Sequence, residues 1–62
     1  MDDHAKAVAD RWAKKRAEAI AAGKSKEEFD QDMLAFLFYG GWSIDNAHAI
    51  LKRAQRKSET EE

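Results

Sequence analysis

Two histidines are the side chains in this sequence best suited to acid-base chemistry or zinc binding near neutral pH, because its 62 residues include no cysteine. His4 stands near the start of the chain, where we expect a solvated side chain. His48 has Leu51 and Lys52 at the helical spacings i+3 and i+4, so no second metal ligand accompanies it. We expect His48 to be partly buried or interfacial, with a role as ligand or general base as the alternative. The sequence therefore predicts no catalytic residues, no metal site and no cofactor, and a protein that is not an enzyme.

Arg16 is the charged residue that the helical pattern places among apolar neighbours, on the same stripe as Trp12. We expect its aliphatic stem to lie at the edge of the core with the guanidinium group in water. The alternative is a buried ion pair with Asp30 or Asp32.

Three predicted helices must position these residues. Ala, Lys, Arg and Glu dominate residues 3–22, and Gly23 is placed to end this first helix in a left-handed conformation. Ser25 and Glu28 match the S-x-x-E capping box, which predicts a second helix from there through residue 39. The pair Gly40-Gly41 then permits a tight reversal of the chain. We find no strand signal and no glycine-rich phosphate loop, because each glycine follows a predicted helix.

The third predicted helix begins at Ser43 as its N-cap and runs to about Lys57. Its expected buried stripe is flanked by Ile50 and consists of Ile44, Ala47, Leu51 and Ala54. The sequence thus predicts an all-α, compact three-helix bundle over residues 1–57, with a tight Gly-Gly turn between the second and third helices. Residues 58–62 contain no apolar side chain, so we expect a disordered acidic tail there.

Length and composition restrict the class of protein further. A chain of 62 residues forms one domain with a marginal core, and without cysteine it cannot be stapled by disulfides. No run approaches the roughly 18 apolar residues of a membrane span, and the acidic start Met1-Asp2-Asp3 is unlike a signal peptide. We therefore expect a cytoplasmic protein with no membrane partner and no small-molecule substrate.

The second predicted helix is apolar on every side over residues 33–39. The stripe that we expect to face inward consists of Phe29, Met33, Phe36 and Leu37. Two short neighbouring helices cannot cover the whole circumference, so an exposed patch is predicted at Leu34, Phe38, Tyr39 and Trp42.

This patch predicts a small non-catalytic protein-binding module, an inhibitor or regulator, that docks on a protein partner or pairs with itself as a homodimer. Under the alternative interpretation, the Gly-Gly turn folds Trp42 back onto the core. The patch would then be smaller and the protein monomeric.

A second function class stays open, since residues 4–58 carry a net charge of +4. The second and third helices would then form a helix-turn-helix that regulates transcription, with the third helix in the major groove of DNA. Asn and Arg can read adenine and guanine edges, whereas Asp45 at the leading end would repel phosphate. The residues proposed for nucleic-acid binding are Ser43, Asn46, Lys52, Arg53 and Arg56.

The chain resembles two kinds of known protein. The segment from Leu34 to Leu51, with Gly40-Gly41, Ile44 and Ala47, resembles the last two helices of ubiquitin-associated-type three-helix domains. The Met-Gly-Phe type loop that such domains carry after their first helix is missing, so the resemblance implies a three-helix fold without ubiquitin binding. The chain also resembles, in its size and lack of a catalytic set, small accessory proteins of phages and plasmids that occlude host proteins or regulate transcription.

Overall fold

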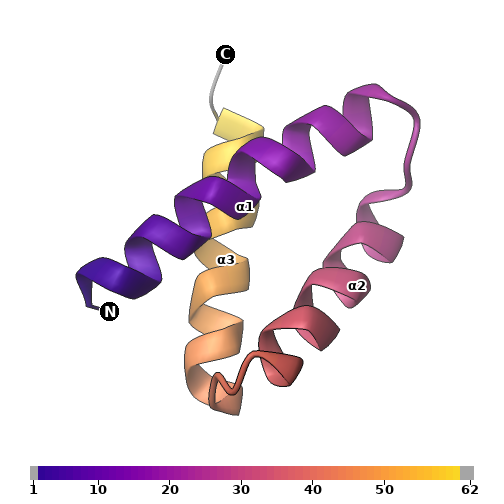
Figure 1. The fold of residues 1–62 in the computed structure, drawn as a ribbon. Helices are drawn as coiled ribbons and strands as arrows, with labels where there is room; N and C mark the ends of the chain where they lie inside the picture. The colour runs from indigo at the N-terminus through magenta and orange to yellow at the C-terminus, as the bar shows by residue number, and fades with distance from the viewer. Residues whose placement is uncertain (1, 61–62) are drawn as a thin grey trace.

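The protein is a bundle of three helices in a computed structural model that describes residues 2–60 (Figure 1). The helices are α1 (Asp3–Ala21), α2 (Lys26–Tyr39) and α3 (Ile44–Thr60). They confirm the predicted all-α fold, and residues 2–60 contain no strand. In Figure 1, α1 crosses α3, while α2 meets α3 at the short turn that joins them. None of these helices is long and apolar enough to cross a membrane.

Gly23 ends α1 in a left-handed conformation, as the sequence predicts. Gly23 has a φ of 101°, a left-handed conformation that a residue with a Cβ rarely adopts. Its N–H donates to the carbonyl of Ile20, and the N–H of Lys24 donates to the carbonyl of Ala19, both at 3.0 Å. This is the Schellman arrangement, which satisfies the last carbonyl groups of α1. At the start of α2, the Ser25 hydroxyl accepts from the Glu28 N–H at 3.5 Å.

The link between α2 and α3 repeats this arrangement. Gly41 has a φ of 91°, and its N–H donates to the carbonyl of Phe38 at 3.1 Å. The N–H of Trp42 donates to the carbonyl of Leu37, also at 3.1 Å. The Schellman turn therefore directs Trp42 back toward α2, where it packs against the core. The hydroxyl of Ser43 caps α3 by accepting from the N–H of Asn46 at 3.2 Å.

The core is small because alanine supplies much of it. The buried apolar residues are Ala5, Ala9 and Ala13 on α1, Phe29, Met33 and Leu37 on α2, and Ala47, Ile50 and Ala54 on α3. Alanine stripes let α1 approach α3 closely, and these two helices form the main packing of the bundle. Each alanine buries little surface, so the apolar stabilisation rests mainly on the four larger side chains.

Two positions expected in the core are exposed. Phe36 points about 60° away from Met33 around the axis of α2, on the side toward α1. Met33 is fully buried in the core, whereas Phe36 is 65% exposed. Ile44 is the first residue of α3, next to the turn from α2, and is exposed, whereas Ile50 almost two turns further on is fully buried. Leu51 is partly buried. The expected inward stripes were therefore wrong at Phe36 and Ile44.

The C-terminal boundary also differs from the expectation. Helix α3 continues through Thr60, so residues 58–60 of the expected disordered tail are helical, and residues 61–62 lie outside the described part. Arg16 supplies the reason, because its guanidinium group bonds to Ser58 and Glu59. Residues 58–60 contain no apolar side chain, so the sequence pattern did not indicate that Arg16 would hold them in the helix.

Candidate functional site

The surface around the turn between α2 and α3 carries the large apolar side chains that are exposed among residues 2–60. Its members expose 65% (Phe36), 44% (Phe38), 91% (Tyr39) and 65% (Ile44) of their surface, and together we name them the aromatic surface. No charged residue occurs from position 33 to position 44. Because successive residues of a helix point 100° apart, Phe36, Phe38 and Tyr39 wrap the outer half of the last turn of α2.

The structure divides the four residues of the predicted patch. Phe38 and Tyr39 are exposed, whereas Leu34 and Trp42 are partly buried and pack against the core. Trp42 is folded back, as the alternative interpretation held, and its indole stacks on the imidazole of His4 with ring centroids 5.5 Å apart. Sequence reasoning missed Phe36 and Ile44, because their spacing matches that of buried neighbours.

The seam between α1 and α2 is lined by aromatic rings. Trp12 makes an edge contact with Phe29 and a tilted contact with Phe36, each with ring centroids 5.9 Å apart. Val8, one turn before Trp12, also packs against the core. Phe36 therefore contacts Trp12 while most of its surface stays exposed.

Charged side chains flank this seam at the end opposite the aromatic surface. Arg11 and Lys15 on α1 are exposed and, among the described residues, have no ion-pair partner. On α2, Glu28 and Asp32 are exposed, and Asp32 pairs with Lys24 at 3.2 Å. The seam thus separates a basic stretch of α1 from an acidic stretch of α2.

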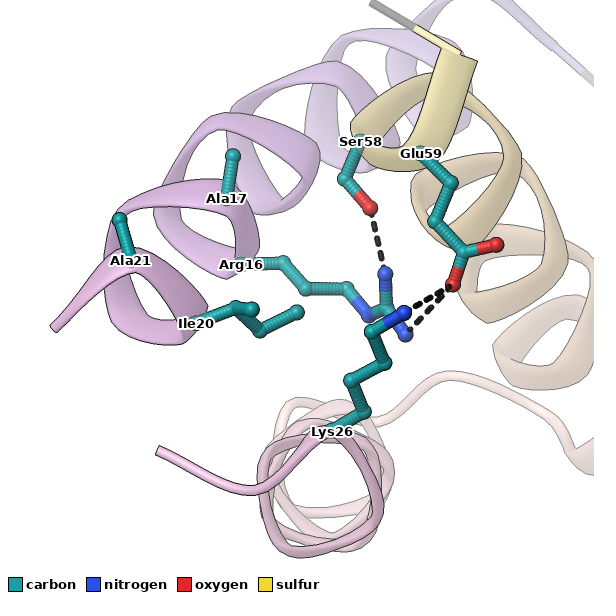
Figure 2. A pocket seen from close by; sticks show the side chains of 7 residues that line it. All are labelled: Arg16, Ala17, Ile20, Ala21, Lys26, Ser58 and Glu59. Carbon is teal, nitrogen blue, oxygen red and sulfur yellow. Dashed lines mark hydrogen bonds and ion pairs between the residues drawn. The ribbon is translucent and has the colours of Figure 1, made fainter. Parts of the chain in front are cut away.

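Arg16 is the most deeply buried charged side chain of the described residues, at 1% exposure, and it connects all three helices. Figure 2 shows its contacts with Ser58 and Glu59 on α3. Its Nε donates to the Asp30 carboxylate at 2.8 Å. One terminal nitrogen donates to the Ser58 hydroxyl at 2.6 Å, and the other lies 3.2 Å from the Glu59 carboxylate. The expectation of a solvated guanidinium group was wrong, and the alternative ion pair with Asp30 is the one observed.

This cluster is saturated with partners. Asp30 also accepts a hydrogen bond from the Gln55 amide at 2.8 Å, and Lys26 lies 3.8 Å from Glu59. Hydrogen bonding to Asp30 raises the pKa of Arg16 despite the opposing effect of burial, so the guanidinium group stays charged. A pocket of about 350 Å³ adjoins it, bordered by the alanines and isoleucine of α1 drawn in Figure 2. The arrangement holds the three helices together.

The polar side of α3 is tied to α1. Arg53 lies 3.1 Å and Lys57 3.5 Å from the carboxylate of Asp10, and the hydrogen bond from Arg53 lowers the pKa of Asp10. Ser43 is occupied as the cap of α3. The remaining residues suggested for nucleic-acid binding are exposed on more than one side of the helix: Asn46, Lys52 and Arg56.

The two histidines do not meet. His48 is exposed, so it is not partly buried, while the expectation that it lies in an interface stays a prediction. Its Nδ1 lies 3.0 Å from the carbonyl of Ile44 in its own helix. His4 is exposed but stacks on Trp42. Within the described residues, no three His, Asp or Glu side chains converge in a way that could hold a metal ion.

Comparison with known proteins gave no match: not to family models, curated proteins or solved structures. A functional assignment for this chain therefore depends on the geometry of the aromatic surface, the seam and the charged cluster.

Proposed function

We propose that this protein is a small, non-catalytic protein-binding module that docks through the aromatic surface. The observation that carries the proposal is the exposure of Phe36 and Tyr39, at 65% and 91%, on a helix end without charge. Tyrosine and other aromatic residues dominate binding hot spots because they bury a large area with few rotatable bonds.

The size of the aromatic surface supports this function. Its four side chains together expose on the order of 500 Å² of surface, if a fully exposed one contributes about 200 Å². Phe36 and Tyr39, which point about 60° apart on α2, supply more than half of this area. Typical monomers have a largest apolar patch of about 300–600 Å², and such patches are often functional. Here it belongs to a molecule with a total accessible surface of only 4421 Å². A surface of this kind is stabilised when a partner covers it.

The described residues outside the aromatic surface give weaker support to catalysis or DNA binding than the aromatic surface gives to protein binding. The cluster around Arg16 joins helices, and the two histidines interact with Trp42 and with a helix carbonyl. Arg53, suggested as a base-reading residue, is held by Asp10. These contacts favour a binding role for the aromatic surface over catalysis or recognition of DNA by α3.

Affinity capture tests the proposal. The immobilised chain is exposed to a lysate of its source cells, and the captured proteins are compared with those retained by the double variant Phe36→Glu, Tyr39→Glu. We expect the specific partners to be lost in this variant, because two carboxylates would enter the contact. Lys52→Glu on the outer side of α3 is the matched control and retains them. Equal capture by all three proteins, combined with a monomeric wild type, would contradict the proposed function.

A further inference from the structure

The side of α1 and α2 that points away from α3 carries two sets of exposed residues that complement each other. We name it the α1–α2 face. On α1 it includes His4, Arg11 and Lys15, with Val8 partly exposed beside them. On α2 it includes Glu28, Asp32, Phe36 and Tyr39. Residues three or four apart on a helix share one side, so each set forms a continuous stripe.

Ring contacts establish how the two stripes run past each other. Trp12 in the middle of α1 touches both Phe29 and Phe36, and His4 at the start of α1 touches Trp42 beyond the end of α2. The stripes are therefore antiparallel. The first turns of α1 lie beside the aromatic end of α2, and the second half of α1 lies beside the acidic first turns of α2.

The charges on the face are opposite on its two sides. The α1 side has Arg11 and Lys15 against the single carboxylate of Glu18, and the α2 side has Glu28 and Asp32 against Lys24. At the other end of the face, His4 and Val8 lie opposite Phe36 and Tyr39, and the carboxylates nearest to them in the sequence are Asp2 and Asp3 at the start of α1.

We infer that a second copy of this chain covers the α1–α2 face through a two-fold axis that runs along the seam between the helices. Rotation about this axis places α1 of one copy over α2 of the other at the same level. Arg11 and Lys15 then approach Asp32 and Glu28 of the second copy, and Tyr39 packs over His4 and Val8. Each contact occurs twice, as a two-fold interface requires. This inference rests on the proposed function and names its partner.

The available area is consistent with a specific dimer. Phe36 and Tyr39 alone expose on the order of 300 Å² per copy, or about 600 Å² for two copies. A biological interface buries at least about 1,000 Å² in total. The partly exposed Val8 and Trp12 and the aliphatic stems of Arg11 and Lys15 supply the remainder.

Association would also supply what the core lacks. Five of the nine buried apolar residues are alanine, and the described residues contain no metal cluster that could act as a staple. Chains of this length usually gain stability from such a staple or from oligomerisation. Phe38 and Ile44 lie outside the α1–α2 face and stay available to a different protein.

Sedimentation equilibrium over micromolar to near-millimolar concentrations tests the dimer with a charge swap. We expect a wild-type dimer whose dissociation constant rises about tenfold or more in Arg11→Glu, and likewise in Asp32→Arg, because each change brings like charges together. The double variant Arg11→Glu, Asp32→Arg restores association. Lys52→Glu, with the same change of charge on α3, leaves it unaltered. Circular dichroism identifies any variant that fails to fold.

Every result of these sedimentation experiments either supports or contradicts the two-fold dimer. Rescue by the double variant supports the two-fold arrangement, since it requires the two positions to face each other across the interface. A wild type that stays monomeric throughout, or a dimer that Arg11→Glu leaves unchanged, overturns it. The proposed function survives a monomeric result if capture from the lysate still depends on Phe36 and Tyr39, so the two failures are distinguishable.

Discussion

Replacing Arg16 with methionine keeps most of the buried apolar stem and removes the guanidinium group that holds Asp30, Ser58 and Glu59. The Asp30 side chain is only 17% exposed, so its carboxylate would lose its counter-ion with little access to water. Removing one partner of a buried pair costs about 3–5 kcal/mol, and the remaining bond from Gln55 favours the lower end, about 3 kcal/mol.

That loss is large for this chain. At roughly 0.05–0.15 kcal/mol per residue, 62 residues have a free energy of unfolding of about 3–9 kcal/mol. We expect Arg16→Met to lower the urea midpoint sharply or to unfold the protein, with circular dichroism at 222 nm as the readout. All variants are compared at one protein concentration, because association would add to stability.

Two further variants separate the contributions within the cluster. Glu59 is 49% exposed, so Glu59→Gln is expected to cost at most about 1 kcal/mol. The double variant Arg16→Met, Asp30→Leu removes both charges together and should recover most of the loss, since an apolar pair of similar volume replaces a buried ion pair at little cost. A loss under about 0.5 kcal/mol in Arg16→Met, or a double variant less stable than the single one, would contradict a stabilising buried ion pair.

Other residues give further tests. Tyr39→Ala should change the free energy of unfolding of the monomer by less than about 0.5 kcal/mol, because the side chain is exposed. Leu37→Ala should cost about 2–5 kcal/mol, because Leu37 is buried. Equal losses for the two variants in urea titration would contradict the exposure of Tyr39. Gly41→Ala should cost about 1–2 kcal/mol because its φ is 91°. Gly40→Ala is its control in thermal melting, since Gly40 has an ordinary φ and an added Cβ there would make only van der Waals contacts of 3.5–3.7 Å. The pKa of Asp10 lies below its ordinary value of 3.8 in the folded state, so its pairing stabilises the protein above that pH, and the stability is lost as the pH falls through the lowered pKa. Asp10→Asn should therefore flatten the acid end of the stability profile, and an unchanged profile would contradict the pairing.

The helix boundaries were predictable because local chemistry decides them. Gly23 and Gly41 adopt the left-handed conformation that ends a helix, and Ser25 and Ser43 satisfy the first N–H groups of α2 and α3. Each signal involves residues within a few positions of one another. The exposure of Phe38 and Tyr39 was also predictable, since an all-apolar helix end cannot be covered by two short neighbours.

Long-range contacts decided the rest. Phe36 is exposed and Ile50 is buried because of the angles at which α1 and α2 pack against α3. Helical spacing alone carries no information on these angles. The guanidinium group of Arg16 is buried because Asp30 and Ser58, 14 and 42 residues away, converge on it and replace its water. The sequence by itself thus determined three helices and an uncharged aromatic end. Only the tertiary structure determined that an arginine would join the helices, and that opposite charges would lie along the two sides of one face.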